Sequence, residues 1–159
     1  MGNKFPGHRP ASPMRKPAEL RTAITAAVPD LQHNPDKLHL FVEEGRVVAT
    51  GAKSLSFEYQ YTLSLLVTDF ADSADAITVP VLAWLRENQP ELFTNPDRRP
   101  DGFKFETDVL NHNTVDLLVK LPLTERVIVT VADGHYQIAH APQPADPYDD
   151  PAGWKLPQP

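Results

Sequence analysis

The sequence predicts an α+β domain, residues 17–140, in which two helices pack on a mainly antiparallel sheet. From Phe57 to Val67 every odd position is apolar, which is the period of a long strand with one buried and one wetted face. Shorter alternating runs joined by turn residues predict further strands. Two other segments repeat apolar residues at helical spacing, and this mixture favours helices packed on one antiparallel sheet.

The first half of the domain is expected to contain a helix, then a hairpin, then a long strand. Residues 18–28 have helical spacing and follow Pro17, which suits a first helical turn. The run from Leu38 to Thr50 alternates on both sides of Glu44-Gly45, a pattern that predicts a two-stranded hairpin. The long strand, 57–68, comes next.

A second helix is expected after this strand. Its apolar stripe consists of Ile77, Val81, Trp84 and Leu85, and Asp72, Ser73 or Asp75 can cap its start. Pro80 lies inside the stripe, so it either kinks the helix or delays its regular start.

The rest of the domain is expected to be strands. A polar loop over residues 94–102 leads to alternating runs at 103–109, 115–121, 127–131 and 136–138. Asn111-His112-Asn113 predicts one hairpin turn, and Asp133-Gly134 is a strong signal for another.

Both ends of the chain are expected to be extended arms. Ten of the 17 prolines lie within residues 1–17 and 142–159, and these segments have few apolar groups to bury. Residues 1–16 form a basic arm, and residues 141–159 contain Trp154, which either docks on a partner or folds back on the domain.

The charge is unevenly placed. The chain carries −6 overall, with +4 in residues 1–17 and −2 in residues 142–159, so residues 18–141 carry −8. An acidic body argues against broad electrostatic binding of nucleic acid. The chain has no cysteine, which excludes disulfides and thiolate chemistry.

No catalytic constellation is recognisable. The glycines are too scattered for a phosphate-binding loop, and the six histidines contain no helical pair suited to zinc. Asp69, Asp72 and Asp75 could bind a divalent cation, but acids at a helix start are also expected for capping. We therefore predict no catalytic residue, no metal and no cofactor.

Interaction surfaces are a better expectation than an active site. Tyr59 and Tyr61 share the apolar face of the long strand and are expected in the core or in an interface. The loop around Arg98 is exposed and mixed in charge, which is typical of solvated charges or of a partner contact. The candidate interface residues are Lys53, Leu55, Phe57, Asp97, Arg98, Arg99, Asp101 and Trp154.

The sequence also resembles a known family over about residues 14–131. The resemblance is carried by Arg15-Lys-Pro17, Ala27-Val28-Pro29, Leu38-His-Leu-Phe-Val42, Ser54-Leu-Ser-Phe-Glu-Tyr59, Val67-Thr-Asp-Phe70, Leu82-Ala-Trp-Leu-Arg86, Gln89-Pro-Glu-Leu92, Thr114-Val-Asp-Leu117 and Leu123-Thr-Glu-Arg-Val127. These motifs are similar to those of the tail completion protein R family of P2-like contractile-tailed bacteriophages. Residues 1–13 and the segment after His140 fall outside the shared pattern.

The resemblance implies a protein of the phage tail. By analogy with tail-terminator proteins, it implies a hexameric ring that caps the head-proximal end of the tail tube, stops polymerisation and offers a surface for head–tail joining. The implied partners are other copies of the chain, the tube protein, neck or head-completion proteins and the tail sheath. Genomic DNA would pass through the lumen without specific binding, and no membrane is involved.

Three alternatives remain open from the sequence. One is a neck or head–tail adaptor that does not form a ring. Another is a metal-dependent enzyme using Asp69, Asp72 and Asp75. The last is a small regulatory binding module of the host, suggested by the basic arm.

Overall fold

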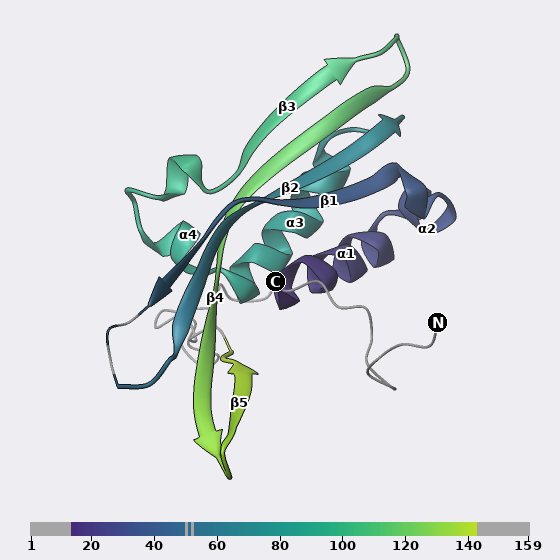
Figure 1. Ribbon diagram of the computed structural model, residues 1–159. Coiled ribbons are helices and arrows are strands. Elements are labelled where there is room, and N and C mark those ends of the chain that lie inside the picture. The colour runs from purple at the N-terminus through teal and green to yellow at the C-terminus, as the bar shows by residue number, and fades with distance from the viewer. Residues whose placement is uncertain (1–13, 50, 52, 143–159) are drawn as a thin grey trace, which may run out of the picture.

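The computed structural model describes residues 14–49, 51 and 53–142. It confirms the predicted α+β class: helices α1 (Arg15–Ala27) and α3 (Asp75–Asn88) cover one face of a curled antiparallel sheet, with the short helices α2 (Pro29–His33) and α4 (Glu91–Thr94) beside them (Figure 1). The strands are β1 (Leu38–Ala49), β2 (Phe57–Phe70), β3 (Lys104–Val109), β4 (Val115–Ala132) and β5 (His135–His140). No helix within these residues is long and apolar enough to cross a membrane. The expected Pro-rich arms lie almost entirely outside the described residues.

The core lies between the helices and the central strands. Alternate residues of β2 and β4 point at the helices and are buried, as their period of two requires. The buried set includes Leu20 and Ile24 of α1, Ile77, Val81, Trp84 and Leu85 of α3, Leu63, Leu65 and Val67 of β2, and Leu117, Val119, Leu121 and Leu123 of β4. The predicted stripe of the second helix is therefore confirmed, and Pro80 lies within the helix without ending it.

The predicted hairpin over residues 38–50 is wrong. Residues 38–49 form one strand, β1, which pairs with β2 on both sides of an irregularity between Glu43 and Arg46. Glu44 adopts a positive φ of 53° there. This geometry is that of a β-bulge, which inserts extra residues into a strand and bends it without reversing the chain. A bulge and a turn use the same residue types, so the sequence alone did not separate them.

The two strands predicted at 115–121 and 127–131 are one strand. β4 runs continuously through the intervening residues and pairs with β2 from Val115 to Val127. Because Val127 pairs with Phe57 on one side and His140 on the other, β5 lies on the same edge of β4 as β3. The sheet order is thus β1-β2-β4-β3, with β5 beside the far end of β4.

Residues 121–126 of β4 have no strand neighbour on the edge that β3 and β5 share. Pro122 falls in this interval, in agreement with the restriction of proline to strand edges. The side chain of Gln89, just after α3, takes the place of a strand: its Oε1 accepts from the Thr124 amide (3.1 Å) and its Nε2 donates to the Thr124 hydroxyl (2.9 Å). The backbone of β4 is thereby satisfied without a strand at that point.

Both predicted turns between late strands are confirmed. Asn111 Oδ1 accepts hydrogen bonds from the amides of Asn113 and Thr114 in the turn between β3 and β4. Asp133 and Gly134 have φ of 50° and 76° between β4 and β5. Two positive φ angles in succession define the type I′ turn, whose twist suits a hairpin.

Candidate interaction surfaces

A buried carboxylate joins both ends of the described chain to the middle of the sheet. Glu125 is 4% exposed on β4 and lies under the start of α1. Its two oxygens accept from the backbone amides of Arg15 (2.8 Å) and Lys16 (3.2 Å). These are the first amides of α1, which have no partner inside the helix, so Glu125 acts as the cap that Met14 does not provide.

The same carboxylate accepts from two further side chains. The Tyr61 hydroxyl donates to Oε2 over 2.8 Å, and His140 Nδ1 lies 3.0 Å from Oε1. Burial, together with the negative charge of Glu125, raises the pKa of Tyr61 well above its usual range. We call Glu125, Tyr61, His140 and the first turn of α1 the Glu125 cluster. It leaves Glu125 closed to a substrate and fixes α1 and the end of β5 to β4.

Lys16 extends this buried network towards α3. Its Nζ donates to the backbone oxygen of Asn88 (2.8 Å) and to Oε1 of Gln89 (2.6 Å). The side chain is 1% exposed, and burial lowers the pKa of Lys16 to about 8, with the nearby carboxylates Glu91 and Glu125 opposing the shift. A lysine expected in a solvated arm is therefore part of the core.

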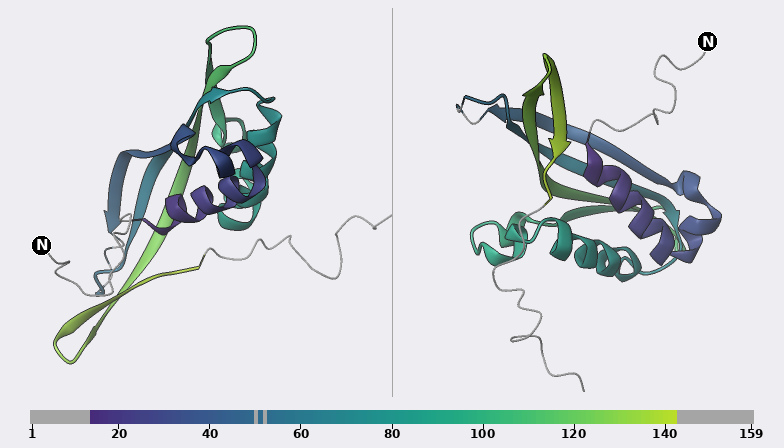
Figure 2. Two further views of the ribbon diagram at one scale, coloured as in Figure 1. Left: turned by 90° about the vertical axis from the view of Figure 1, so that its right-hand side faces the viewer. Right: turned by 90° about the horizontal axis from the view of Figure 1, so that it is seen from below.

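Beyond the Glu125 cluster, β4 and β5 leave the body as a projecting hairpin (Figure 2). We call residues 127–140 the arm, which is distinct from the two terminal arms expected from the sequence. Val129 pairs with Ile138 and Val131 pairs with Tyr136, so these four side chains share one face of the arm. Three of them are exposed, and only Val129, whose amide donates to Ser56 Oγ (3.0 Å), is buried.

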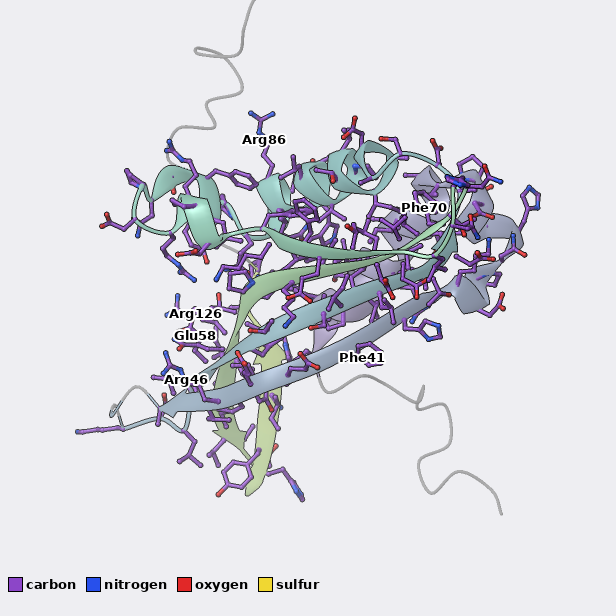
Figure 3. The ribbon with its side chains drawn as sticks, turned by 90° about the horizontal axis from the view of Figure 1, so that it is seen from above. Phe41, Arg46, Glu58, Phe70, Arg86 and Arg126 are labelled. Atoms are coloured by element: carbon purple, nitrogen blue, oxygen red, sulfur yellow. The ribbon has the colours of Figure 1, made fainter. Side chains whose placement is uncertain are left out.

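The sheet face opposite the helices is polar at the end near the arm. Arg46 Nε donates to Gln60 (2.7 Å), and Gln60 Nε2 donates to Glu58 (3.1 Å). Glu58 pairs in register with Arg126, and Figure 3 shows Arg46, Glu58 and Arg126 gathered on this side. Such a hydrogen-bonded surface is stable in water and needs no cover.

A hollow of about 880 Å³ lies where the loop before β3 meets the sheet. Its lining mixes acids, bases and Phe103 and Phe105, with no cluster of one sign: Glu44, Thr62, Asp97, Arg98, Asp101, Lys104, Glu106, Lys120 and Pro122 complete it. Neither a single anion nor an apolar molecule is specifically matched by such a lining.

The candidate interface residues lie in two separate places. Lys53, Leu55 and Phe57 are in or beside the turn before β2, near the arm, and Leu55 is exposed. Asp97, Arg98 and Asp101 line the hollow, with Arg99 exposed next to them. Trp154 lies outside the described residues. Their role in binding stays a prediction.

The acidic trio does not form a metal site. Among the described residues no three His, Asp or Glu side chains are close enough to hold an ion. The Asp72 carboxylate accepts from the Ser73 amide (2.7 Å), and the backbone carbonyl of Asp69 accepts from Lys37 Nζ. The Asp72 bond is typical of a turn at a helix start.

Sequence reasoning missed the Glu125 cluster. Glu125 occupies an odd position of β4, in phase with Leu121, Leu123 and Val127, which are all buried. An acid in phase with a buried apolar face is the signal that could have found it, because buried carboxylates need partners. His140 is one of those partners.

A small α+β domain with a projecting hairpin (Figure 2) whose apolar face is exposed has the features of an assembly protein. A family model, P2 phage tail completion protein R (GpR), matches residues 14–144. The chain is 46% identical over 134 residues to "Tail completion protein R" of Escherichia phage P2, covering 84% of this chain and 86% of the relative. The chain therefore belongs to the P2 phage tail completion protein R family. No solved structure matches it.

Proposed function

We propose that this chain completes the phage tail by capping the head-proximal end of the tail tube as a ring of identical subunits. The observation that carries the proposal is the 46% identity to a tail completion protein over most of both chains. The exposed apolar face of the arm supports a role through surfaces.

A ring-shaped cap needs two kinds of contact. Neighbouring subunits must meet through two different patches, because such heterologous contacts close into a ring. The ring must then bind the last tube subunits on one side and refuse further tube subunits on the other. Termination is thus a matter of which surfaces are offered.

The charge of the chain suits passage of DNA through such a ring. Residues 18–141 carry −8, and phosphates are repelled by an acidic surface. A lumen lined by this domain would let DNA slide without trapping it. Neck or head-completion proteins and the sheath are further proposed partners.

The test is to delete the gene and examine the tails by electron microscopy. Overlong tails are expected if the chain ends tube growth, and tails of normal length without heads if it serves as a joining adaptor. Labelled protein should mark the head-proximal end of wild-type tails. Normal infectious particles without the gene would overturn the proposal.

A further inference from the structure

The arm carries an apolar face that residues 14–142, as far as the structure describes them, leave uncovered. Val131, Tyr136 and Ile138 are 69%, 65% and 66% exposed, although they lie in phase with the buried side of β4. The helices end before the arm begins (Figure 2). A projecting hairpin with a continuous exposed apolar face is typical of an interaction site.

The arm also offers an unprotected strand edge. β5, His135–His140, contains no Lys, Arg, Asp, Glu or Pro, and its register with β4 is regular. Free edges are normally blunted by charges, prolines or bulges. β3 follows that rule, because Lys104, Glu106 and Asp108 make half of its six residues charged. β5 is therefore the edge at which another strand can add.

The complementary edge is at the other side of the same sheet. Among the strands that the structure describes, none lies on the outer side of β1. Its first five residues, Leu38–Val42, carry no charged side chain, and Phe41 and Val42 are 45% and 38% exposed. The strand β5 and residues 38–42 of β1, which precede the bulge, thus present two edges without charges or bulges, both with apolar side chains, on opposite sides of one sheet.

We propose that the arm binds a second copy of this chain, with β5 adding to the outer edge of β1 in the neighbouring subunit. Two different edges on opposite sides of the sheet give a heterologous contact, the kind that closes a ring. The inference rests on the proposed function and assigns the subunit contact within it.

The chain's own terminal segments fit the arm less well. Residues 1–13 offer Met1 and Phe5 as their large apolar side chains, too few to cover the face. Residues 143–159 carry −2, and the single charged residue of the arm is Asp133, also negative. Charge complementarity therefore disfavours the second segment, whereas β1 brings apolar side chains and an open edge.

Crosslinking tests the contact directly, because the chain has no cysteine of its own. Ile138→Cys and Phe41→Cys proteins of different mass are mixed and treated with a short bismaleimide, both free in solution and bound to isolated tails. The yield of the mixed dimer should be at least tenfold higher than the yield of a dimer of either variant with itself. Phe105→Cys, on β3 and 62% exposed, is the matched control. Mixed with Ile138→Cys in place of Phe41→Cys, it should give no mixed dimer.

Other occupants would be visible in the same experiment. A mixed dimer absent both in solution and on tails would overturn the proposal, as would an Ile138→Cys product formed with tube protein alone. Faster thiol labelling of Ile138→Cys after removal of residues 143–159 would show that the chain's own end covers the arm. That result too would overturn it.

Charged substitutions separate this inference from the proposed function. Tyr136→Asp with Ile138→Asp should lower the yield of subunit crosslinks at least tenfold and prevent tail completion, with an unchanged circular dichroism spectrum. Gln137→Glu, on the opposite face of β5, should complete tails normally. If the double variant completes tails, the arm contact is wrong and the completion role stands. If wild-type protein never joins tails, the completion role is wrong, and crosslinking in solution alone decides the arm contact.

Discussion

The two halves of β4 have the same alternating pattern, but the far end of the second half is exposed. In the first half, Leu117, Val119, Leu121 and Leu123 are at most 1% exposed under the helices, whereas Val131 in the second half is 69% exposed. Both sets point to the same side of one continuous strand. Alternation in the sequence therefore decides which face of a strand is apolar. It does not decide whether anything covers that face.

The boundary between the halves is set by the Glu125 cluster. Glu125 holds the first turn of α1, so the helical layer starts at the level of this residue. Val127 and Val129 just beyond it are still buried, whereas Val131 further along the arm is exposed. One buried carboxylate therefore lies between the core under the helices and the exposed end of the arm.

The largest expected effect comes from placing one charge in each half. Val119→Asp should abolish cooperative unfolding or lower the free energy of unfolding by about 4 kcal/mol or more, because an aspartate would be buried without a partner. Val131→Asp, the same change on the same face, should cost less than about 1 kcal/mol because the site is exposed. Urea denaturation measures both, and equal losses would show that the two halves do not differ as described.

A smaller loss of stability is expected from removing the Glu125 carboxylate. Glu125→Ala should lower the free energy of unfolding by about 3 kcal/mol, because Tyr61 and two amides of α1 lose their charged acceptor. Amide hydrogen exchange at Arg15 and Lys16 should accelerate most. His140→Ala, which removes only the most solvent-exposed partner, is the control and should cost less than about 1 kcal/mol. Unchanged exchange in Glu125→Ala would contradict the capping role.

The smallest effect is a slope in stability against pH, due to Lys16. Its pKa is about 8 when folded and 10.5 when unfolded. From pH 8 upward the unfolded chain therefore binds more protons, and stability should rise by roughly 1.5 kcal/mol between pH 8 and 9.5. Lys16→Met should remove this rise between pH 8 and 9.5. The window ends there because Tyr61, whose pKa is raised on folding, makes stability fall above pH 10. An identical slope in wild type and variant would contradict the assignment.

Much of the fold was predictable because it depends on local chemistry. The stripe from Ile77 to Leu85 specified the second helix, and Asp133-Gly134 specified the turn of the arm. Both signals lie within a few residues of the structure that they determine. The family was also recognisable from sequence, since the shared motifs are spread along most of the chain.

The errors came from features that depend on a distant partner. Glu44-Gly45 was expected to turn the chain, but pairing of β1 with β2 on both sides makes it a bulge. Residues 115–121 and 127–131 were expected to be two strands, but Gln89 fills the edge beside Thr124 and β4 continues through both. Lys16 was placed in a solvated arm, although Asn88 and Gln89, more than 70 residues away in sequence, accept its hydrogen bonds.

The sequence by itself determined the α+β class, the apolar face of each strand and the tail completion family, because periodicity, turn chemistry and shared motifs are written along the chain. Only the tertiary structure decided that β3 and β5 share one edge of β4 and that Glu125 closes the core under α1. It also decided that Val131, Tyr136 and Ile138 at the far end of the arm are exposed. Those features depend on contacts between residues far apart in sequence, and local patterns carry no information about which distant group will satisfy a backbone edge or a buried charge.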